Sequence, residues 1–413
     1  MKSPGLARCI RIRRVGDKEQ EKGVTLSEPV IEQKAALKLD EQYCSRCSIC
    51  RSLCPFEAIK KDVETGKTLL EIEKCQVCGI CYSACPARAI DITYYDSDSL
   101  IKYLEKVKPK YDSGALVIMC KGSAPDFAGV ERLFGVSKFI PLSVPCVGRV
   151  ADEVFLAAIA MGVREICVLA CDEDYCRFDR GSPLTGRRVL ALNRLLEQLG
   201  YGREAIILKR NSLKVKVDRD LCISCGNCAF YCPYGAASLE SPGGAKFDLD
   251  ACRGCGLCVA ICPAIALDLD NWERERISTL VSRLVAEMKS PKVLVFRCQW
   301  AVFPPLDGQF GPNVRAIDLP CAARVDTFHI LEAFQKGVGG VLIAACSEED
   351  CKQEKASGKA SHSITVLKER LKQIGLQDRL HFCSVAPRYP EQWDKELQQF
   401  SQRIKDISKG RRK

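Results

Sequence analysis

The chain has 413 residues, which is enough for several domains, and 27 of them are cysteine. A secreted disulfide scaffold is usually short and follows a signal peptide, whereas this N-terminus has no apolar core or cleavage pattern. The sequence also lacks any apolar run of about 18 residues. We therefore expect a cytoplasmic protein without a transmembrane segment, whose thiolates bind metal. The only histidines are His329, His362 and His381, which disfavours a His-rich zinc site, Rieske ligation or His-based acid–base catalysis.

The formal net charge of +10 by itself suggests nucleic acid or a membrane surface as a partner. That charge counts every cysteine as a neutral thiol. An oxidised iron–sulfur cluster with four thiolates carries about −2, so six such clusters would bring the chain to roughly −2. The basic residues are then explained as compensation for cluster charge, and we expect no nucleic-acid role.

Residues 1–39 form a charged extension with an isolated Cys9, for which we expect a tail or a strap on a partner. Residues 40–95 contain CSRCSICRSLCP and CQVCGICYSACP, two copies of C-x₂-C-x₂-C-x₃-C-P. This run holds [4Fe–4S] clusters in bacterial ferredoxins, where the fourth cysteine serves the cluster of the other run. Structural zinc, the alternative, usually takes C-x₂-C pairs. The predicted ligands are Cys44, Cys47, Cys50 and Cys85 for cluster 1, and Cys75, Cys78, Cys81 and Cys54 for cluster 2.

Between the two runs, strand-like segments flank a Thr65-Gly66 turn. The next domain is expected over 96–212 and begins with a helix that has apolar residues at helical spacing. Ser97 or Ser99 is its predicted cap, and Pro109 its end. Apolar strands at 115–120, 138–146, 165–171 and 204–208 then alternate with helices at 151–162 and 185–200. This alternation is typical of a parallel sheet covered by helices.

Three cysteines, Cys120, Cys146 and Cys171, stand at or just past the carboxyl ends of predicted strands, and Cys176 follows in a loop. The carboxyl ends of parallel strands share one edge of a sheet, so we expect these four thiols to converge. Cys167 lies inside a strand and is predicted to be a small buried hydrophobic residue.

The chain then repeats itself. Residues 213–272 are expected to form a second ferredoxin-like domain, 273–390 a second α/β domain, and 391–413 a C-terminal helix with a basic tail. Cys44 and Cys222 are 178 residues apart, and so are Cys120 and Cys298, which indicates a tandem duplication. The predicted ligands are Cys222, Cys225, Cys228 and Cys262 for cluster 3; Cys252, Cys255, Cys258 and Cys232 for cluster 4; and Cys298, Cys321, Cys346 and Cys351 for the second α/β site. The tail KGRRK is expected to be solvated rather than bound to nucleic acid or lipid.

The spacing of the α/β cysteines alone would also suit buried thiols, zinc or disulfides. The segments PCVGRVADEVFLAAIAMGVREICVLACDEDYC and PCAARVDTFHILEAFQKGVGGVLIAACSEEDC, however, resemble the delta subunit of methyl-viologen-reducing hydrogenase, and FRCQWA is similar to that family's opening cysteine motif. The resemblance implies a [2Fe–2S] cluster at each α/β site and electron transfer to heterodisulfide reductase. The chain departs from the family at Ser123 and Ala301, where a further Cys is usual, and at Arg177 and Lys352, where His is usual.

Arg149 and Arg324 each follow a predicted ligand by three residues. Either they offset the negative charge of a cluster, or they face solvent at the start of a helix. The sequence leaves both interpretations open.

The predicted fold is therefore multidomain, α+β and α/β, with two ferredoxin-like domains alternating with two small parallel-sheet domains. We expect a multi-cluster electron-transfer subunit of a cytosolic, anaerobic redox hetero-oligomer. The resemblance suggests a heterodisulfide-reductase-like flavoprotein as one partner and a hydrogenase or formate dehydrogenase as the other. The chain has no G-x-G-x-x-G or P-loop motif, so we expect no flavin or nicotinamide site. Two alternatives remain: disulfide reduction at a terminal cluster with Cys383 or Cys167, and a scaffold with structural zinc in the α/β domains.

Overall fold

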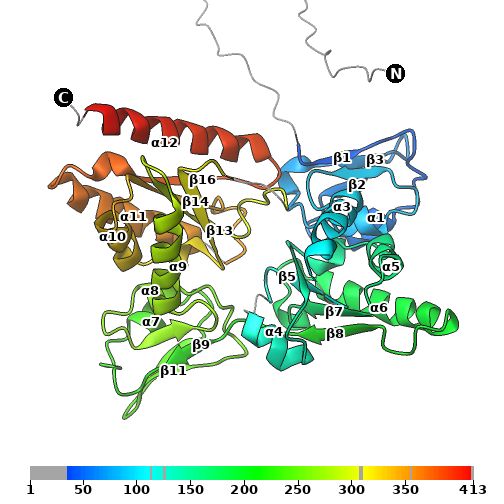
Figure 1. Cartoon of the computed structure of the whole chain (residues 1–413), viewed down its shortest axis with the longest axis horizontal. Coiled ribbons are helices and arrows are strands. Elements are labelled where there is room, and N and C mark those ends of the chain that lie inside the picture. The colour runs from blue at the N-terminus through cyan, green and yellow to red at the C-terminus, as the bar shows by residue number, and fades with distance from the viewer. Residues whose placement is uncertain (1–34, 112–113, 124–126, 307–309, 354–355, 411–413) are drawn as a thin grey trace, which may run out of the picture. The chain divides into compact units, whose positions relative to one another are not determined.

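The computed structural model describes residues 35–111, 114–123, 127–306, 310–353 and 356–410, which belong to one compact unit (Figure 1). The extension with Cys9 lies almost wholly outside the described residues. None of the helices in the described part of the chain is long and apolar enough to span a bilayer.

The first cysteine-rich region is built from two small antiparallel sheets and two short helices. Strand β1 (Leu37–Leu39) pairs with β4 (Ile90–Ile92), and β2 (Ile59–Lys61) pairs with β3 (Thr68–Leu70). Helices α1 (Ile49–Leu53) and α2 (Ile80–Ala84) start within the cysteine runs. The predicted Thr65-Gly66 turn is confirmed, because Gly66 has φ +65° and the Thr65 N–H donates to Asp62 Oδ1 at 2.7 Å.

The predicted linker helix is α3 (Ser97–Val107), followed by a 3₁₀ turn over Lys108–Lys110. The predicted cap was wrong by one residue. Asp96 precedes the helix in an extended conformation, and its carboxylate accepts from the Ser99 N–H at 2.9 Å. A carboxylate at this position satisfies a free N–H of the first turn and favours the helix dipole.

A parallel sheet with strand order β6-β5-β7-β8 follows, as predicted. Its strands and helices occupy the following residues: β5 Ala115–Cys120, α4 Phe127–Phe134, β6 Ile140–Val144, α5 Asp152–Ala160, β7 Glu165–Ala170, α6 Gly181–Gln198 and β8 Ile206–Arg210. Helix α4 was not predicted. The central strands β5 and β7 are buried on both faces except at Met119 and Glu165, which explains their continuous apolar sequence.

The second cysteine-rich region repeats the arrangement of the first. Its elements are β9 Val215–Val217 paired with β12 Leu267–Leu269, β10 Ala237–Glu240 paired with β11 Gly244–Phe247, and the short helices α7 Asn227–Tyr231 and α8 Leu257–Ala260. Helix α9 (Arg274–Glu287) takes the place of α3.

The second parallel sheet has the order β14-β13-β15-β16, the same relative order as the first. Its elements are β13 Val293–Cys298, β14 Val314–Leu319, α10 Thr327–Gln335, β15 Gly340–Ala345, α11 Ala356–Lys372, β16 Leu380–Ser384 and α12 Pro390–Gly410. Helix α12 packs on β15, where Phe400 and Ile404 contact the backbone at Gly340. A side chain at Gly340 would displace them, since its Cβ would lie 2.5 Å from Ile404 Cδ1.

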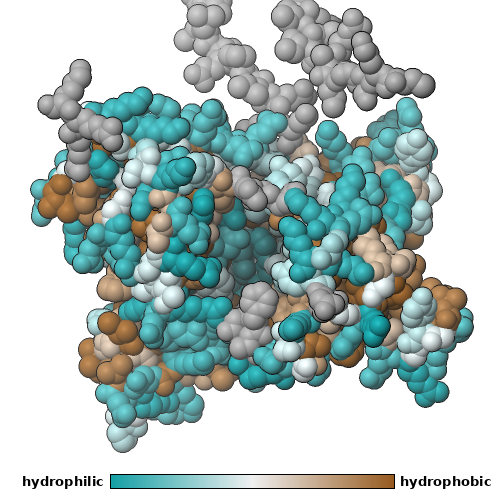
Figure 2. Space-filling model, in the orientation of Figure 1, coloured by the Kyte–Doolittle hydropathy of each residue, from teal (hydrophilic) through white to brown (hydrophobic). Residues whose placement is uncertain are grey.

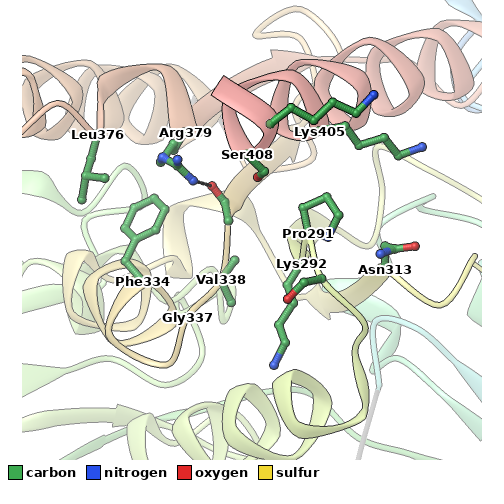
Figure 3. A pocket seen from close by; sticks show the side chains of 13 residues that line it. Pro291, Lys292, Asn313, Phe334, Gly337, Val338, Leu376, Arg379, Lys405 and Ser408 are labelled. Atoms are coloured by element: carbon green, nitrogen blue, oxygen red, sulfur yellow. Dashed lines mark hydrogen bonds between the residues drawn. The ribbon is translucent and has the colours of Figure 1, made fainter. Parts of the chain in front are cut away.

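A cavity of about 780 Å³ opens at the amino ends of the second sheet's strands (Figure 3). Lys292 and Asn313 precede β13 and β14, and Arg379 precedes β16; Arg379 Nη1 donates to the Gly339 carbonyl at 2.9 Å. No described residue lining this cavity is a cysteine. The predicted thiol sites lie at the opposite, carboxyl ends of the strands.

Candidate metal centres

The thiols predicted for cluster 1 lie around one cavity. Cys44, Cys47, Cys50 and Cys85 all line it, so Cys85 of the second run lies with three cysteines of the first. Burial raises the pKa of Cys50, and the nearby thiols of Cys85, Cys44 and Cys47 add to this effect. Closely spaced thiols in one pocket are stable as thiolates only when cations compensate their charge. This set therefore fits a [4Fe–4S] cluster.

The thiols predicted for cluster 2 form the most buried set of the first cysteine-rich region. Burial raises the pKa of Cys81 well above its usual value, and the charges of Cys78, Cys75 and Cys54 act in the same direction. Cys54 belongs to the first run and the other three to the second, which is the predicted exchange. The Val77 N–H donates to Cys75 Sγ at 3.4 Å.

The second cysteine-rich region has two equivalent cavities. Cys222, Cys225, Cys228 and Cys262 line one of them. Cys232, Cys252, Cys255 and Cys258 line the other. Both groupings are those predicted from the spacing.

Backbone conformation explains how each run wraps around its cavity. A left-handed residue precedes each short helix: Ser48 with φ 63°, Gly79 with 79°, Gly226 with 79° and Gly256 with 77°. Three of the four are glycine, which adopts this conformation without a Cβ clash. The reversal lets thiols on both sides of it face the same space.

The first α/β set gathers at the carboxyl edge of its sheet, as predicted. Cys120 Sγ and Cys171 Sγ are 3.3 Å apart. A Cβ built on Gly181 would lie 2.3 Å from Cys146 Sγ and 3.5 Å from Cys176 Sγ, which places the other two thiols side by side at this glycine. Two thiolates on one tetrahedral metal, with bonds of about 2.3 Å, lie about 3.8 Å apart. Two such pairs suit a cluster with two metal ions.

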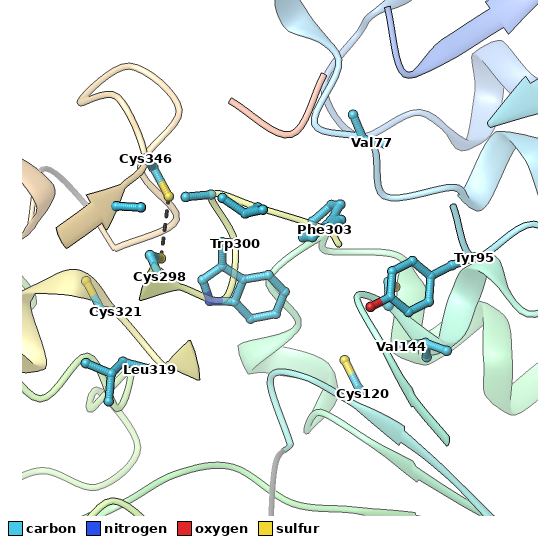
Figure 4. Close-up of a cluster of buried hydrophobic side chains, with 14 of the residues drawn as sticks. Val77, Tyr95, Cys120, Val144, Cys298, Trp300, Phe303, Leu319, Cys321 and Cys346 are labelled. Carbon is cyan, nitrogen blue, oxygen red and sulfur yellow. Dashed lines mark hydrogen bonds between the residues drawn. The ribbon is translucent and has the colours of Figure 1, made fainter. Parts of the chain in front are cut away.

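The second α/β set has the same arrangement. Cys298 Sγ and Cys346 Sγ are 3.6 Å apart (Figure 4). A hydrogen bond to Cys298 and burial raise the pKa of Cys321, and the charge of Cys351 acts in the same direction. Within the described ranges, no three His, Cys, Asp or Glu side chains converge as they would around a single metal ion.

Gly181 provides a direct test of the first α/β site. We expect Gly181→Ala to prevent binding of the predicted [2Fe–2S] cluster, because the added methyl overlaps Cys146 Sγ, and to destabilise the fold by about 1–3 kcal/mol. Iron content and the thermal midpoint of the full chain measure the two effects. Gly311→Ala is the matched control, since nothing lies within 4 Å of its Cβ. A Gly181→Ala chain with unchanged iron and [2Fe–2S] signals would show that the site is not a cluster cradle.

Arg149 and Arg324 are only 1% and 0% exposed, so the solvent-facing interpretation is wrong. Arg149 Nη2 donates to the Tyr94 carbonyl at 3.2 Å, whereas its Nε and Nη1 have no hydrogen-bond partner among the described residues. Burial lowers its pKa, and the charges of Cys78 and Cys146 oppose that effect. These cysteines belong to different predicted clusters. The guanidinium therefore stands beside both.

Glycines make room for the two arginines. A Cβ at Gly79 would lie 2.7 Å from Arg149 Cβ, and one at Gly256 would lie 2.5 Å from Arg324 Cδ. Arg324 Nη2 donates to the Trp272 carbonyl at 2.9 Å. Sequence reasoning did not connect these glycines with the arginines, although both pairs recur in register in the two halves.

Contacts between the two halves were also missed. Gln76, which follows the predicted ligand Cys75, donates to Asp350 Oδ1 at 2.7 Å and accepts from Lys352. In the opposite direction, Arg177 donates to the carbonyl of Arg253, which follows the predicted ligand Cys252. Each α/β cysteine loop thus touches the ferredoxin-like loop of the other half. Arg177 and Lys352 are two of the four positions where the sequence departs from the family, and that departure was the available signal.

The two remaining described cysteines are isolated. Cys167 is 0% exposed inside β7, as predicted, and Cys383 is 5% exposed in β16. Burial raises the pKa of each thiol to about 12. Such thiols stay protonated near neutral pH and are poor nucleophiles.

Comparison with known families agrees with this architecture. The family model described as methyl-viologen-reducing hydrogenase, delta subunit, matches residues 116–216 and 293–408, together more than half of the chain. Models described as 4Fe-4S dicluster domain match residues 36–86 and 215–268. The dicluster matches and the grouped cysteines support iron–sulfur clusters in this chain.

Curated relatives fall into two groups. The first group holds the A subunits of two CoB-CoM heterodisulfide reductases. The chain is 29% identical over 336 residues to that of the ferredoxin-dependent enzyme of Methanosarcina mazei, and 30% identical over 314 residues to that of the ferredoxin/F420H2-dependent enzyme of Methanosarcina acetivorans. These alignments cover 76% and 71% of this chain but only 39% and 36% of the relatives.

The second group consists of hydrogenase proteins. The chain is 29% identical over 99 residues to the iron–sulfur protein, named the D subunit, of the vhc F420-non-reducing hydrogenase from Methanococcus voltae. This alignment covers 22% of the present chain and 69% of the relative. Both groups are iron–sulfur or redox proteins of multi-subunit assemblies, in agreement with the family match.

Proposed function

Because the chain belongs to the family of the delta subunit of methyl-viologen-reducing hydrogenase, we propose that it is an electron-transfer subunit of a redox complex. It would relay electrons between a donor, which is a hydrogenase, a formate dehydrogenase or a flavoprotein, and a heterodisulfide-reductase-like partner. The observation that carries this proposal is that the predicted ligand sets adjoin one another in two rows.

Neighbouring thiols define each row. The charge of Cys50, of the cluster 1 set, is among those that raise the pKa of Cys81, of the cluster 2 set, and the charge of Cys78, also of the cluster 2 set, raises that of Cys146. The cluster 1 set, the cluster 2 set and the first α/β set therefore follow in order. The second half shows the same order. The charge of Cys228, of the cluster 3 set, is among those that raise the pKa of Cys258, of the cluster 4 set. The charge of Cys255, also of the cluster 4 set, is among those that raise the pKa of Cys321.

In this proposal the chain holds four [4Fe–4S] and two [2Fe–2S] clusters on the six sets. When bound, each cluster accepts and returns a single electron. The polypeptide binds them through thiolates and shields the α/β sites from water. Arg149 and Arg324 offset negative charge. The arrangement is a tandem duplication with ferredoxin-like domains at 40–95 and 213–272 and α/β domains at 96–212 and 273–390.

Each row has an exposed outer end. Cys47 and Cys225 are exposed, whereas every α/β thiol is buried or half-buried. Near Cys225, the side chains of Ile223 and Phe230 are 66% and 81% exposed. Figure 2 shows apolar side chains gathered in the region of α7. Apolar surface beside an exposed centre suits the docking of a redox partner.

We expect the double variant Ile223→Glu and Phe230→Glu to slow electron exchange with a copurifying redox partner by at least about tenfold, because two charges would be buried in the contact. Stopped-flow absorbance of the clusters measures the rate. Val63→Glu is the control, since Val63 is 97% exposed on the turn between β2 and β3. If both variants exchange electrons at the wild-type rate, this surface is not the docking site.

The alternative of disulfide reduction by this chain requires a reactive thiol beside a cluster. Cys167 and Cys383 are buried with raised pKa values, which disfavours that role. The scaffold alternative requires zinc at the α/β sites and is decided by metal content.

The function is tested by purifying the tagged full chain anaerobically from its native cells, together with its partners. Adding the substrate of the donor, H₂ or formate, should bleach the visible absorption of the clusters. A preparation of the chain alone that reduces a disulfide at an enzymatic rate would overturn the proposal. So would clusters that stay oxidised with every donor that copurifies.

A further inference from the structure

The two α/β sites meet at Trp300. This residue follows Cys298 by two positions, on the turn after β13, and is 2% exposed. Hydrogen bonds with Cys321 and Cys346 contribute most to lowering the pKa of Cys298. The backbone N–H of Trp300 donates a further hydrogen bond that acts in the same direction. Figure 4 shows the indole lying between Cys298 of the second site and Cys120 of the first. The ring thus extends from one set of thiols toward the other.

The residue that receives the indole is Gly122. Gly122 follows Cys120 by two positions, so it occupies in the first half the place that Trp300 occupies in the second. A Cβ on Gly122 would lie 2.6 Å from Cys171 Sγ and 3.4 Å from Trp300 Cη2. The far edge of the indole therefore fills the space beside Cys171 that a side chain at Gly122 would take. The second half of the chain thus supplies the indole of Trp300, and the first half leaves room for it at Gly122.

Packing alone does not explain a tryptophan here. Trp300 Nε1 is buried and has no hydrogen-bond partner among the described residues. An unpaired buried N–H costs about 1–3 kcal/mol, and buried indoles usually find an acceptor. Phenylalanine or leucine would fill an apolar core without that cost. The neighbouring ring of Phe178, two residues after Cys176, meets Trp300 edge to face with centroids 5.5 Å apart.

We propose that Trp300 bridges the two [2Fe–2S] sites for electron transfer, with the indole itself neither oxidised nor reduced. This inference rests on the proposed function. One electron leaves the site that is reduced, which is thereby oxidised, and arrives at the other, which is thereby reduced; no bond forms or breaks and no proton moves. Electron transfer between cofactors slows steeply as the gap between them grows, so a large ring that extends from one site toward the other favours this path. The two rows then join into one path from Cys47 to Cys225.

The test uses the full chain, given one electron per molecule from dithionite and freeze-quenched at increasing times for electron paramagnetic resonance. In the wild-type chain the two [2Fe–2S] signals should reach their equilibrium proportions by the first time point. Trp300→Leu removes the ring, and Trp300→Phe shortens it so that it no longer reaches Gly122. In both variants we expect a separate kinetic phase in which the electron redistributes between the two sites. In the leucine variant this redistribution should be at least tenfold slower than in the wild-type chain. Trp393→Leu, a buried tryptophan of α12, is the control and should behave as wild type.

A second readout needs no variant: when both sites are reduced, their signals should broaden or split each other. If Trp300→Leu keeps both [2Fe–2S] signals and the electron redistributes as fast as in the wild-type chain, the inference is overturned and the proposed function is left intact. If the leucine variant loses a cluster, the phenylalanine variant decides by the same criterion. Wild-type signals without mutual broadening would also overturn it. A wild-type chain with no [2Fe–2S] signal would overturn the proposed function and this inference together.

Discussion

Replacing Arg149 with glutamine is expected to make the two centres beside it harder to reduce. The guanidinium is 1% exposed and lies beside Cys78 and Cys146, which belong to the sets proposed to hold cluster 2 and the first [2Fe–2S] cluster. A unit charge at about 6 Å with an effective dielectric constant near 20 contributes about 3 kcal/mol. For a one-electron couple this corresponds to a shift of roughly 100 mV toward more negative potential.

The duplication supplies the controls for this experiment. Arg324→Gln should shift the equivalent pair in the second half and leave the first pair unchanged. Arg149→Lys keeps the positive charge, so the reduction potentials of both centres should stay close to their wild-type values. Redox titrations followed by electron paramagnetic resonance measure all centres in one sample. Unchanged potentials in an Arg149→Gln chain that keeps all its iron would mean that the arginine packs the loops together without influencing the clusters.

The second large effect is expected from Cys85→Ser. Cys85 lies in the second cysteine run but lines the cavity of Cys44, Cys47 and Cys50. The substitution should therefore remove the cluster of the first run, at a loss of about four iron atoms per chain. Cluster 2, the more buried of the two clusters in this region, should remain.

Cys54→Ser is the matched variant, because Cys54 lies in the first run but is close to Cys81. It should abolish cluster 2 and keep cluster 1, which includes the exposed Cys47. Iron content combined with the redox titration of each variant distinguishes the two results. If each variant instead lost the cluster of its own run, the exchange of the fourth cysteine would be wrong.

Local pattern was sufficient for most of the fold. A continuous apolar run predicted β5 at its observed residues, because strands buried on both faces have no alternation to misread. Cysteines at strand ends were predicted to share an edge, and the parallel pairing brings Cys120 and Cys171 within 3.3 Å. Helix α4 was missed because it is short and follows a glycine-containing loop.

The contacts between the two halves could not be predicted from the sequence. A buried arginine and an exposed one look alike at the start of a helix, so only the packing against Gly79 decides the role of Arg149. Likewise, Trp300 follows a ligand in an apolar segment, where a core position is the simplest interpretation. Its position beside Cys171 depends on how two sheets about 180 residues apart in the sequence meet. Spacing within one motif carries no information about that contact.

The most direct test of the six-centre account is iron and sulfide quantification on the anaerobically purified full chain, with electron paramagnetic resonance after reduction. Four [4Fe–4S] and two [2Fe–2S] clusters predict about 20 iron atoms per chain, with [2Fe–2S] signals beside those of the larger clusters. About 16 iron atoms with about two zinc ions, and no [2Fe–2S] signal, would contradict the account, because both α/β sites would then be structural.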